Sequence, residues 1–214
     1  RKLDKYDFDV VHSQTQFYMG GLAYMVAKRK KIPHFTTIHT LFTELIDDYP
    51  LAISAGVVFV SIGIPFVFKS KPVLPFGSAK DIMAWSRTDM TTMLKRQGWR
   101  LFAEFANHTD GFVSPSEHLA RTLIKSGAKV DCHIVPNGIN LTRYQEAKVS
   151  DSPITKRPGE KLILCVARLS AEKRQATLID AMRYVKDKNA RLVLVGEGPL
   201  DDALHELAES YGVQ

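Results

Sequence analysis

Short runs of apolar and β-branched residues alternate along this chain with longer stretches in which apolar residues recur at helical spacing. Apolar runs of this length that end in polar residues are typical of buried parallel strands. The pattern predicts strands at residues 8–13, 34–40, 111–115 and 132–139, and helices at residues 17–31, about 81–107 and directly after Ser114. Strand, helix and strand at this spacing imply parallel sheets wrapped by helices, which is an α/β architecture.

A second unit of the same kind follows a polar segment. Residues 145–160 are polar and include Pro153 and Pro158, so we interpret them as a linker between one domain at residues 1–144 and another at 161–214. The second domain is predicted to contain strands at residues 161–169 and 190–198 and helices at about 173–187 and 199–211. Two strands are too few to bury both faces of a sheet, and we expect both domains to be incomplete in this chain.

Two short signals predict local backbone structure. Ser114, Pro115 and Glu117 fit the N-cap, the first helical position and the acid of a capping box. Farther along, the Asn137-Gly138 dipeptide at the end of the predicted strand 132–139 is typical of a turn. We therefore expect a helix that begins at Pro115 and a turn at Asn137.

Residues 51–68 contain no charged residue. A membrane-spanning helix needs roughly 20 apolar residues, so this stretch is at the margin, and it is interrupted by glycines and by Pro65. A span would also put the strands on either side of it on opposite sides of a bilayer, which a single sheet does not allow. Three interpretations remain open: a spanning helix, a buried segment of the core or of a cleft, and a lipid-facing segment.

The predicted helix at about 81–107 has two possible roles. Its aromatic and cationic residues are of the kind found in helices that lie at a membrane interface; they are Trp85, Lys95, Arg96, Trp99, Arg100 and Phe102. In the alternative, one apolar side packs inward and the cations are merely solvated. That side would carry Met90, Leu94, Leu101 and Phe105. The two roles are compatible.

Composition and charge narrow the possible functions. Hydrophobic residues make up 45% and charged residues 24% of the chain, which is typical of a globular protein. The two cysteines, Cys132 and Cys165, are too few for a disulfide framework and suggest a reducing compartment; we expect no cleavable signal at the first residues. No Ser–His–Asp or Cys–His set with workable roles is visible, which disfavours a hydrolase.

The net charge is +6, from 29 lysines and arginines against 23 aspartates and glutamates. The whole surplus falls within residues 1–150, since residues 151–214 are balanced. A basic surface attracts nucleic acid, anionic lipid or phosphorylated ligands, although a modest surplus is also compatible with a solvated face. Motifs for nucleic-acid recognition are missing, so we expect no nucleic-acid partner.

A candidate anion site lies in the second domain. Ligands of open parallel sheets bind outside the carboxyl ends of the strands. Arg168 follows the first strand of this domain and Lys173 is expected to open the next helix, with Ser170 as its cap and backbone N–H groups facing the same crevice. The second strand ends in a Gly196-Glu197-Gly198 turn, whose glycines allow close approach of a ligand. Such an arrangement suits a diphosphate, although basic residues at two strand ends also occur without a ligand.

At these residues the chain resembles the family-four, retaining glycosyltransferases of the GT-B fold. The motifs that carry the resemblance stand in the order of that family, and they are DVVHSQT, TTIHT, GFVSPSEHLARTL, IVPNGIN, VARLSAEK and LVLVGEGP. The resemblance covers nearly the whole chain. It implies two Rossmann-like parallel-sheet domains that face a cleft, and a nucleotide-sugar donor held mainly by the second domain.

The resemblance also implies roles for individual residues. Arg168 and Lys173 would hold the donor diphosphate, and Gly196 and Glu197 would lie near the nucleotide. His39 would be the catalytic residue that reaches the transferred sugar. The residues expected on the acceptor side of the cleft are His12, Ser116 and Asn137. No metal and no cofactor are expected, because protein cations would stabilise the leaving diphosphate.

Within the family, residues 12–42 are similar to bacterial diacylglycerol glucosyltransferases, which are peripheral membrane enzymes. This similarity implies UDP-glucose as the donor, a membrane lipid such as diacylglycerol as the acceptor, and an anionic membrane surface at the cytoplasmic face as the location. Two alternatives remain: a transferase for a soluble sugar, polysaccharide or protein acceptor, and a noncatalytic binding module. Departures from the group are Gln16, Glu44, Ala167 and Arg174, which bear on the acceptor more than on the reaction.

Two elements of the family are missing from the sequence. One is the glycine-rich loop near the N-terminus, and the other is the Glu-x7-Glu element whose acids face the donor ribose and sugar. We therefore expect the 214-residue chain by itself to be inactive in sugar transfer.

Overall fold

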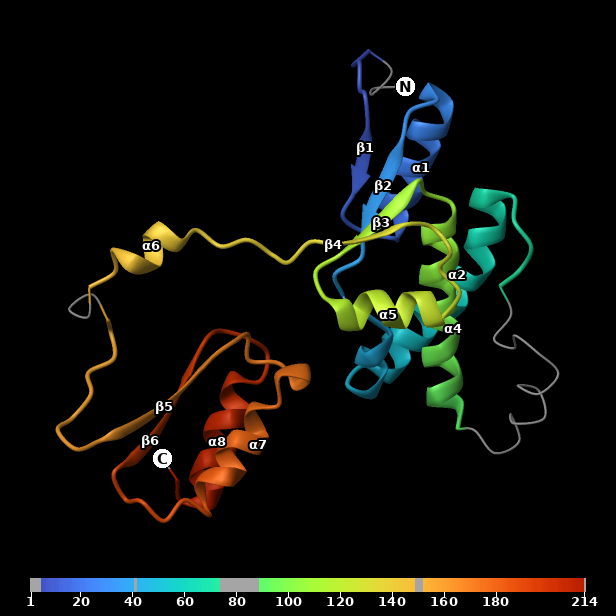
Figure 1. Cartoon of the computed structure of the whole chain (residues 1–214). Coiled ribbons are helices and arrows are strands. Elements are labelled where there is room, and N and C mark those ends of the chain that lie inside the picture. The colour runs from blue at the N-terminus through green and yellow to red at the C-terminus, as the bar shows by residue number, and fades with distance from the viewer. Residues whose placement is uncertain (1–4, 41, 74–88, 149–151, 214) are drawn as a thin grey trace. The chain divides into compact units, whose positions relative to one another are not determined.

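The computed structural model describes residues 5–40, 42–73, 89–148 and 152–213. The chain divides into two units, Arg1–Gly138 and Ile139–Gln214, each with its own sheet (Figure 1). The boundary between the units precedes the short helix α6, Leu141–Gln145, and residues 146–160 contain no helix or strand where they are described.

The first unit is built on a four-stranded sheet whose strands are all parallel, in the order β1-β2-β3-β4. The strands are β1 (Val11–Ser13), β2 (His34–Thr37), β3 (Gly111–Ser114) and β4 (Cys132–Ile134). All four lie inside the predicted strands but are shorter. Because neighbouring strands are parallel, their carboxyl ends meet at one edge of the sheet.

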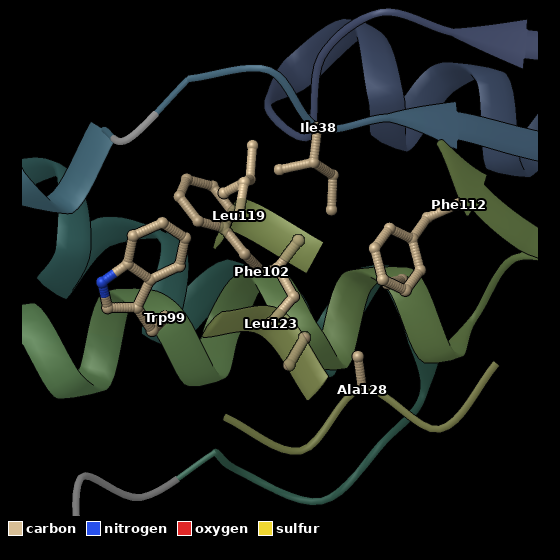
Figure 2. Close-up of a cluster of buried hydrophobic side chains, with 9 residues drawn as sticks. Ile38, Trp99, Phe102, Phe112, Leu119, Leu123 and Ala128 are labelled. Carbon is tan, nitrogen blue, oxygen red and sulfur yellow. The ribbon is translucent and has the colours of Figure 1, made fainter. Parts of the chain in front are cut away.

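Five helical elements belong to the described part of this unit, where they pack on the sheet or on one another. They are α1 (Tyr18–Lys30), the 3-10 helix η1 (Phe42–Asp47), α2 (Pro50–Phe68), α4 (Met90–Asn107) and α5 (Glu117–Lys125). Side chains of α4 and α5 meet the sheet in one buried cluster, which includes Phe102, Phe112, Leu119 and Leu123 (Figure 2). A second cluster joins α1, η1, α2 and α4 through Tyr24, Ile46, Ile53 and Phe105, among others. Parallel strands with covering helices confirm the expected α/β architecture.

The start of α5 differs from the prediction. Ser114 is the last residue of β3 and its hydroxyl donates to the carbonyl of Ser116 at 2.8 Å. Ser116 is the N-cap, because its Oγ accepts the N–H of Leu119 at 3.3 Å. The assignment of Ser114 as N-cap and Pro115 as first helical residue is therefore wrong by two positions. The predicted turn at Asn137 is also wrong, since residues 135–140 are irregular.

The interfacial role predicted for α4 is wrong for its aromatic residues. Trp99 and Phe102 are buried, as Figure 2 shows for both rings. Lys95 is paired with two acids of η1, at 2.6 Å from Asp47 and 3.3 Å from Glu44. The predicted inward side is confirmed at Leu101 and Phe105, which are buried, and at the partly buried Leu94, whereas Met90 is exposed. Trp85 and the predicted start of this helix lie outside the described residues.

The second unit holds a pair of parallel strands, β5 (Lys161–Val166) and β6 (Ala190–Val195), in register over all six residues. The 3-10 helix η3 (Ala171–Lys173) and the helices α7 (Gln175–Met182) and α8 (Asp201–Tyr211) follow the strands. Leu169, Ile179 and Leu204 form the small core, with Leu192 and Leu194 of β6 against it. Helix α7 is shorter than the predicted helix 173–187 at both ends, because η3 takes up Lys173 and the helix ends at Met182.

Candidate functional site

The four candidate residues of the first unit follow the topology of its sheet. His12 lies in β1, whereas His39, Ser116 and Asn137 come after β2, β3 and β4 respectively. Strand pairing sets His12 opposite Phe35 and Ser114 opposite Ile134. All four side chains are exposed. His12 is in β1 itself, whereas the catalytic candidate His39 and the acceptor-side candidates Ser116 and Asn137 follow strands whose carboxyl ends share one edge of the parallel sheet.

The ring of His12 is held between the first two strands. Its Nε2 is 2.7 Å from the Thr37 hydroxyl of β2 and 3.3 Å from the amide nitrogen of Gln14. Because an amide nitrogen can only donate, Nε2 of His12 accepts, and the ring proton is on Nδ1. The Nδ1 of His39, by contrast, has an exposed neighbour in the Thr40 hydroxyl at 3.3 Å. Of the two histidines, His39 is the less restrained.

A buried polar network underlies this edge, and it was not predicted from the sequence. Ser13 Oγ donates to Thr36 Oγ1 at 3.0 Å, so the Nε2–H of His34 donates to Ser13 Oγ, also at 3.0 Å. The Nδ1 of His34 is buried with no hydrogen-bond partner in the described structure. The available signal was the two-residue spacing of His34 and Thr36, which puts both on one face of β2.

Burial sets the charge state of His34. It lowers the pKa of the imidazole below its usual value, because the charged ring would lose its water. Asp110 raises this pKa and His12 lowers it, both by smaller amounts. The carboxylate of Asp110 also accepts the backbone N–H of His34 at 2.8 Å. His34 is thus a neutral member of the network beneath the candidate site.

Two residues at which the sequence departs from its relatives have structural roles. The amide of Gln16 donates to Thr36 Oγ1 at 3.0 Å and to the Thr37 carbonyl at 2.8 Å, which ties the loop after β1 to β2. Glu44 accepts the indole N–H of Trp99 at 3.0 Å and pairs with Lys95. Glu44 therefore fastens η1 to α4.

In the second unit, Arg168 lies just beyond the end of β5. Its backbone carbonyl accepts the amide of Gln175 at 2.8 Å, and the N–H of Leu169 donates to the carbonyl of Glu197 at 2.9 Å. The side chain of Arg168 is 65% exposed and pairs with Glu172, Nη2 to Oε1, at 3.0 Å. Lys173 and Glu197 are also exposed. Arg168 and Glu197 are thus neighbours at the carboxyl ends of two paired strands.

The predicted helix cap near Arg168 is wrong. Ser170 is fully buried, makes no capping bond, and donates its hydroxyl to Glu172 Oε1 at 2.6 Å. The N–H groups of Lys173 and Arg174 donate to the carbonyls of Ser170 and Ala171 inside the 3-10 turn. The N–H groups of Lys173 and Arg174 are therefore unavailable to a ligand, and any positive charge offered to an anion here belongs to side chains.

The glycines of the turn after β6, Gly196 and Gly198, allow close contact with the backbone of the loop after β5. A Cβ on Gly196 would lie 1.9 Å from the carbonyl oxygen of Ala167, and one on Gly198 would lie 2.2 Å from that of Leu169. Such distances exclude any side chain, so both positions need glycine. Both glycines are needed for the close approach of this turn to the loop that carries Arg168. Their role in the approach of a ligand stays a prediction.

A hollow of about 740 Å³ in the second unit lies beside β6. It is lined by apolar residues of α7, α8 and β6, such as Ile179, Leu192 and Leu204, by charged residues such as Glu160 and Arg191, and by Gly196. Arg168, Lys173 and Glu197 are not among its lining residues. Across the described parts of the chain, no group of three or more His, Cys, Asp or Glu residues is placed to hold a metal ion.

Comparison with known families decides what these two units are. The profile of Glycosyltransferase Family 4 matches residues 1–143, and that of Glycosyl transferases group 1 matches residues 148–214. The chain belongs to the family-four glycosyltransferases. Its parallel sheets and covering helices are those of the Rossmann-like GT-B fold, as the motifs had implied.

Curated relatives cover almost the whole chain. The alpha-monoglucosyldiacylglycerol synthases of Streptococcus pneumoniae (strain ATCC BAA-255 / R6) and Acholeplasma laidlawii are 26% and 24% identical to it, each over 98% of this chain. A GDP-mannose-dependent alpha-(1-6)-phosphatidylinositol monomannoside mannosyltransferase of Mycobacterium tuberculosis is 30% identical over 41% of this chain and 24% of its own length. The chain spans 41% and 47% of the two synthases. The similarity to diacylglycerol glucosyltransferases is confirmed.

Proposed function

We propose that this protein is a retaining glycosyltransferase that moves a hexose from a nucleotide-sugar to a membrane lipid. The observation that carries the proposal is the match of two glycosyltransferase profiles to the two parallel-sheet units. Diacylglycerol is the first candidate acceptor, because both synthases that align over 98% of the chain are named for a glucosylated diacylglycerol. UDP-glucose is the proposed donor, and the cytoplasmic face of the membrane is the proposed location.

Arg168 and Lys173 are the proposed diphosphate ligands. Both cations are exposed at the carboxyl end of β5, where charge-assisted hydrogen bonds to phosphate oxygens are available. The Glu172 carboxylate, whose side chain is only 15% exposed, holds the guanidinium of Arg168 beside this edge. As the bond between the sugar C1 and the diphosphate breaks, these cations would stabilise the negative charge on the leaving group, so the proposal includes no metal.

The carboxyl edge of the first sheet is the proposed acceptor side. The exposed imidazole of His39 is the group proposed to touch the transferred sugar, with His12, Ser116 and Asn137 beside it on the same edge. In a retaining transfer the acceptor hydroxyl oxygen forms its bond to C1 on the face that the diphosphate leaves, and the hydroxyl proton passes to the leaving diphosphate. The restrained ring of His12 suits acceptor binding, because its Nδ1–H is a donor of fixed direction.

Donor turnover by the natural full-length protein tests this proposal. The assay offers UDP-glucose and GDP-mannose with diacylglycerol or phosphatidylinositol in vesicles, and measures release of the nucleoside diphosphate. Arg168→Ala or Lys173→Ala should lower kcat/KM roughly 10- to 150-fold. This corresponds to a loss of about 1.5–3 kcal/mol of transition-state stabilisation for each charged hydrogen bond removed. The matched control is Arg183→Ala, which removes an arginine paired with Asp180 on α7 and should leave donor use unchanged.

Several results would contradict the proposal. Unchanged kcat/KM in both cation variants would remove Arg168 and Lys173 from the donor site. Turnover only with soluble sugars or proteins would replace the lipid acceptor, and donor binding without turnover under all conditions would indicate a noncatalytic module.

A further inference from the structure

The outward face of α2 is entirely apolar. By length and composition α2 is the one helix among the described residues that could cross a membrane. Leu51, Phe59 and Phe66 are 87%, 77% and 80% exposed. The exposed residues of this helix are Pro50, Leu51, Ala52, Ala55, Val58, Phe59, Ile62, Phe66 and Val67. Their spacing of three, four and seven residues puts them on one side of a helix about 28 Å long.

The opposite face of α2 is fixed to the first unit. Ile53, Val57, Ile64 and Phe68 are buried, and the helix packs on η1 and α4. Phe68 anchors its C-terminal end, since its ring centroid is 4.5 Å from that of Tyr24 and its plane is stacked on His108 at 4.3 Å. A helix held along one side by a folded domain is not surrounded by lipid, which argues against a span.

An exposed surface of this size and composition requires a partner. Soluble proteins rarely expose contiguous apolar patches as large as this, and those that do use them for protein or membrane contacts. Four apolar residues of α2 are buried in the core, whereas Phe59, Ile62 and Phe66 on its outer face are 77%, 62% and 80% exposed. Burial in the core therefore explains the apolar residues on the inner face of α2 but not those on its outer face.

Charges near α2 favour a lipid surface as that partner. Lys69 and Lys71 are exposed directly after its last turn. Lys28 of α1 is nearby, because its ammonium donates to the hydroxyl of Tyr24, the ring that packs on Phe68. At the other end of the helix, Lys95 pairs with both Asp47 and Glu44 and offsets part of their negative charge. Cations beside an apolar helical face match the anionic headgroups and the acyl chains of a bilayer interface.

We propose that α2 is the membrane-docking element of this protein and lies in the plane of the bilayer interface. Phe59, Ile62 and Phe66 enter the acyl-chain boundary, while Lys69 and Lys71 contact headgroups. The inference rests on the proposed lipid acceptor. Of the two segments considered for membrane contact, it retains α2 and excludes the aromatic residues of α4, which are buried. Insertion of the apolar side chains supplies most of the binding free energy, and the two lysines supply a preference for anionic lipid.

Flotation of the full chain with vesicles tests the proposal. The vesicles are phosphatidylcholine alone or phosphatidylcholine with phosphatidylglycerol at about 7:3, in low salt and in 1 M NaCl, where charges are screened within about 3 Å. Binding should persist in 1 M NaCl. The double variant Phe59→Gln/Phe66→Gln should lower the partition coefficient at least about tenfold in both salts, since burial of one Phe is of that order.

Two further variants serve as controls. Ile124→Gln/Val166→Gln changes exposed apolar residues elsewhere and should bind vesicles like the unchanged chain. Lys69→Glu/Lys71→Glu should lose the preference for anionic vesicles but retain binding to neutral ones. The substituted side chains are exposed, so the thermal midpoint of each variant should stay within a few degrees of the parent, and that measurement excludes unfolding as the cause of lost binding.

Other results would overturn the docking role of α2. These are unchanged vesicle binding by Phe59→Gln/Phe66→Gln, complete loss of binding in 1 M NaCl, or self-association that the double variant abolishes while vesicles are never bound. The proposed function fails separately: vesicle binding without sugar transfer by the full-length protein would contradict the reaction and leave the docking surface in place. Transfer to detergent-solubilised diacylglycerol without any vesicle binding would support the reaction and contradict the docking role of α2.

Discussion

At the scale of single residues, His34 shows how a side chain takes its properties from its neighbours. The ring is buried, donates through Nε2 to Ser13, and has its Nδ1 enclosed without a partner in the part of the chain that is described. A second proton on this ring would be a buried charge facing no carboxylate within hydrogen-bond distance. The burial of His34 was not predicted from the sequence, because attention fell on His39 at the other end of the same predicted strand.

The pH dependence of stability follows from the lowered pKa of His34. The unfolded chain takes up a proton on this residue near the usual pKa of 6.5, whereas the folded chain keeps the ring neutral to lower pH. Between these two pKa values the unfolded state holds more protons, so the free energy of unfolding falls as the pH drops below about 6.5. Urea unfolding between about pH 8 and pH 5 measures this slope. His34→Gln should flatten it, and equal slopes in both proteins would contradict the assignment.

Gly196 makes a second residue-scale prediction. Gly196→Ala forces a Cβ to within 1.9 Å of the Ala167 carbonyl oxygen, and the two loops must separate. Overpacking of this kind costs about 1–3 kcal/mol of unfolding free energy, measured by urea titration. Gly138→Ala is the matched control, because no atom lies within 4 Å of a Cβ at that position. Equal stability of the two variants would show that the close approach is not needed.

At the scale of elements, α4 explains both a confirmed and a wrong prediction. Helical spacing correctly predicted an inward side with Leu101 and Phe105. It missed Trp99 and Phe102 because α4 contributes to both buried clusters, one shared with α5 and the sheet and the other with α1, η1 and α2. A helix enclosed on two sides buries a much wider arc than the single stripe that amphipathic spacing assumes.

Substitution of Trp99 tests the burial of α4. Trp99→Ala should lower the free energy of unfolding by about 3–5 kcal/mol, because it empties a core position and leaves Glu44 without the indole N–H. Vesicle flotation by the folded variant should be unchanged, since this ring faces the interior. Met90→Ala, an exposed position of the same helix, should change stability by less than about 0.5 kcal/mol. Similar stabilities for these two variants would restore the interfacial interpretation of Trp99.

At the scale of the whole molecule, the alternation of strands and helices predicted the order of the strands β1 to β6 and the edge to which their carboxyl ends point, whereas η1 and α6 were not predicted and α2 was left open. Parallel pairing sends the carboxyl ends of β1 to β4 to one edge, so His12, His39, Ser116 and Asn137 gather there by topology. Hydrogen bonds among side chains were not predictable, because they depend on strand register. Pairing of Ser13 with Thr36, for example, creates the contact that links His34 to Gln16.

Limited proteolysis tests the division into two units. Lys148 and Lys156 are exposed and lie outside every described helix and strand, and such sites are cleaved first. Brief trypsin treatment should therefore cut after one of these residues and leave two resistant pieces, identified by mass spectrometry. Lys148→Gln/Lys156→Gln should slow this cleavage, with Lys125→Gln on α5 as the matched control. First cuts inside a described helix or strand of either unit would contradict the division.

The backbone bonds beyond β5 and β6 have a consequence for selectivity. Ala167 N–H donates to Val195, Leu169 N–H to Glu197 and Leu200 N–H to Leu169, so hydrogen bonding between the two segments continues past the last strand residues. The loops that bear Arg168 and Glu197 are thus preorganised, and their conformational entropy is lost on folding and not on ligand binding. Discrimination between nucleotides at this edge would then arise from the chemistry of a few projecting side chains, without rearrangement of the loops beneath them.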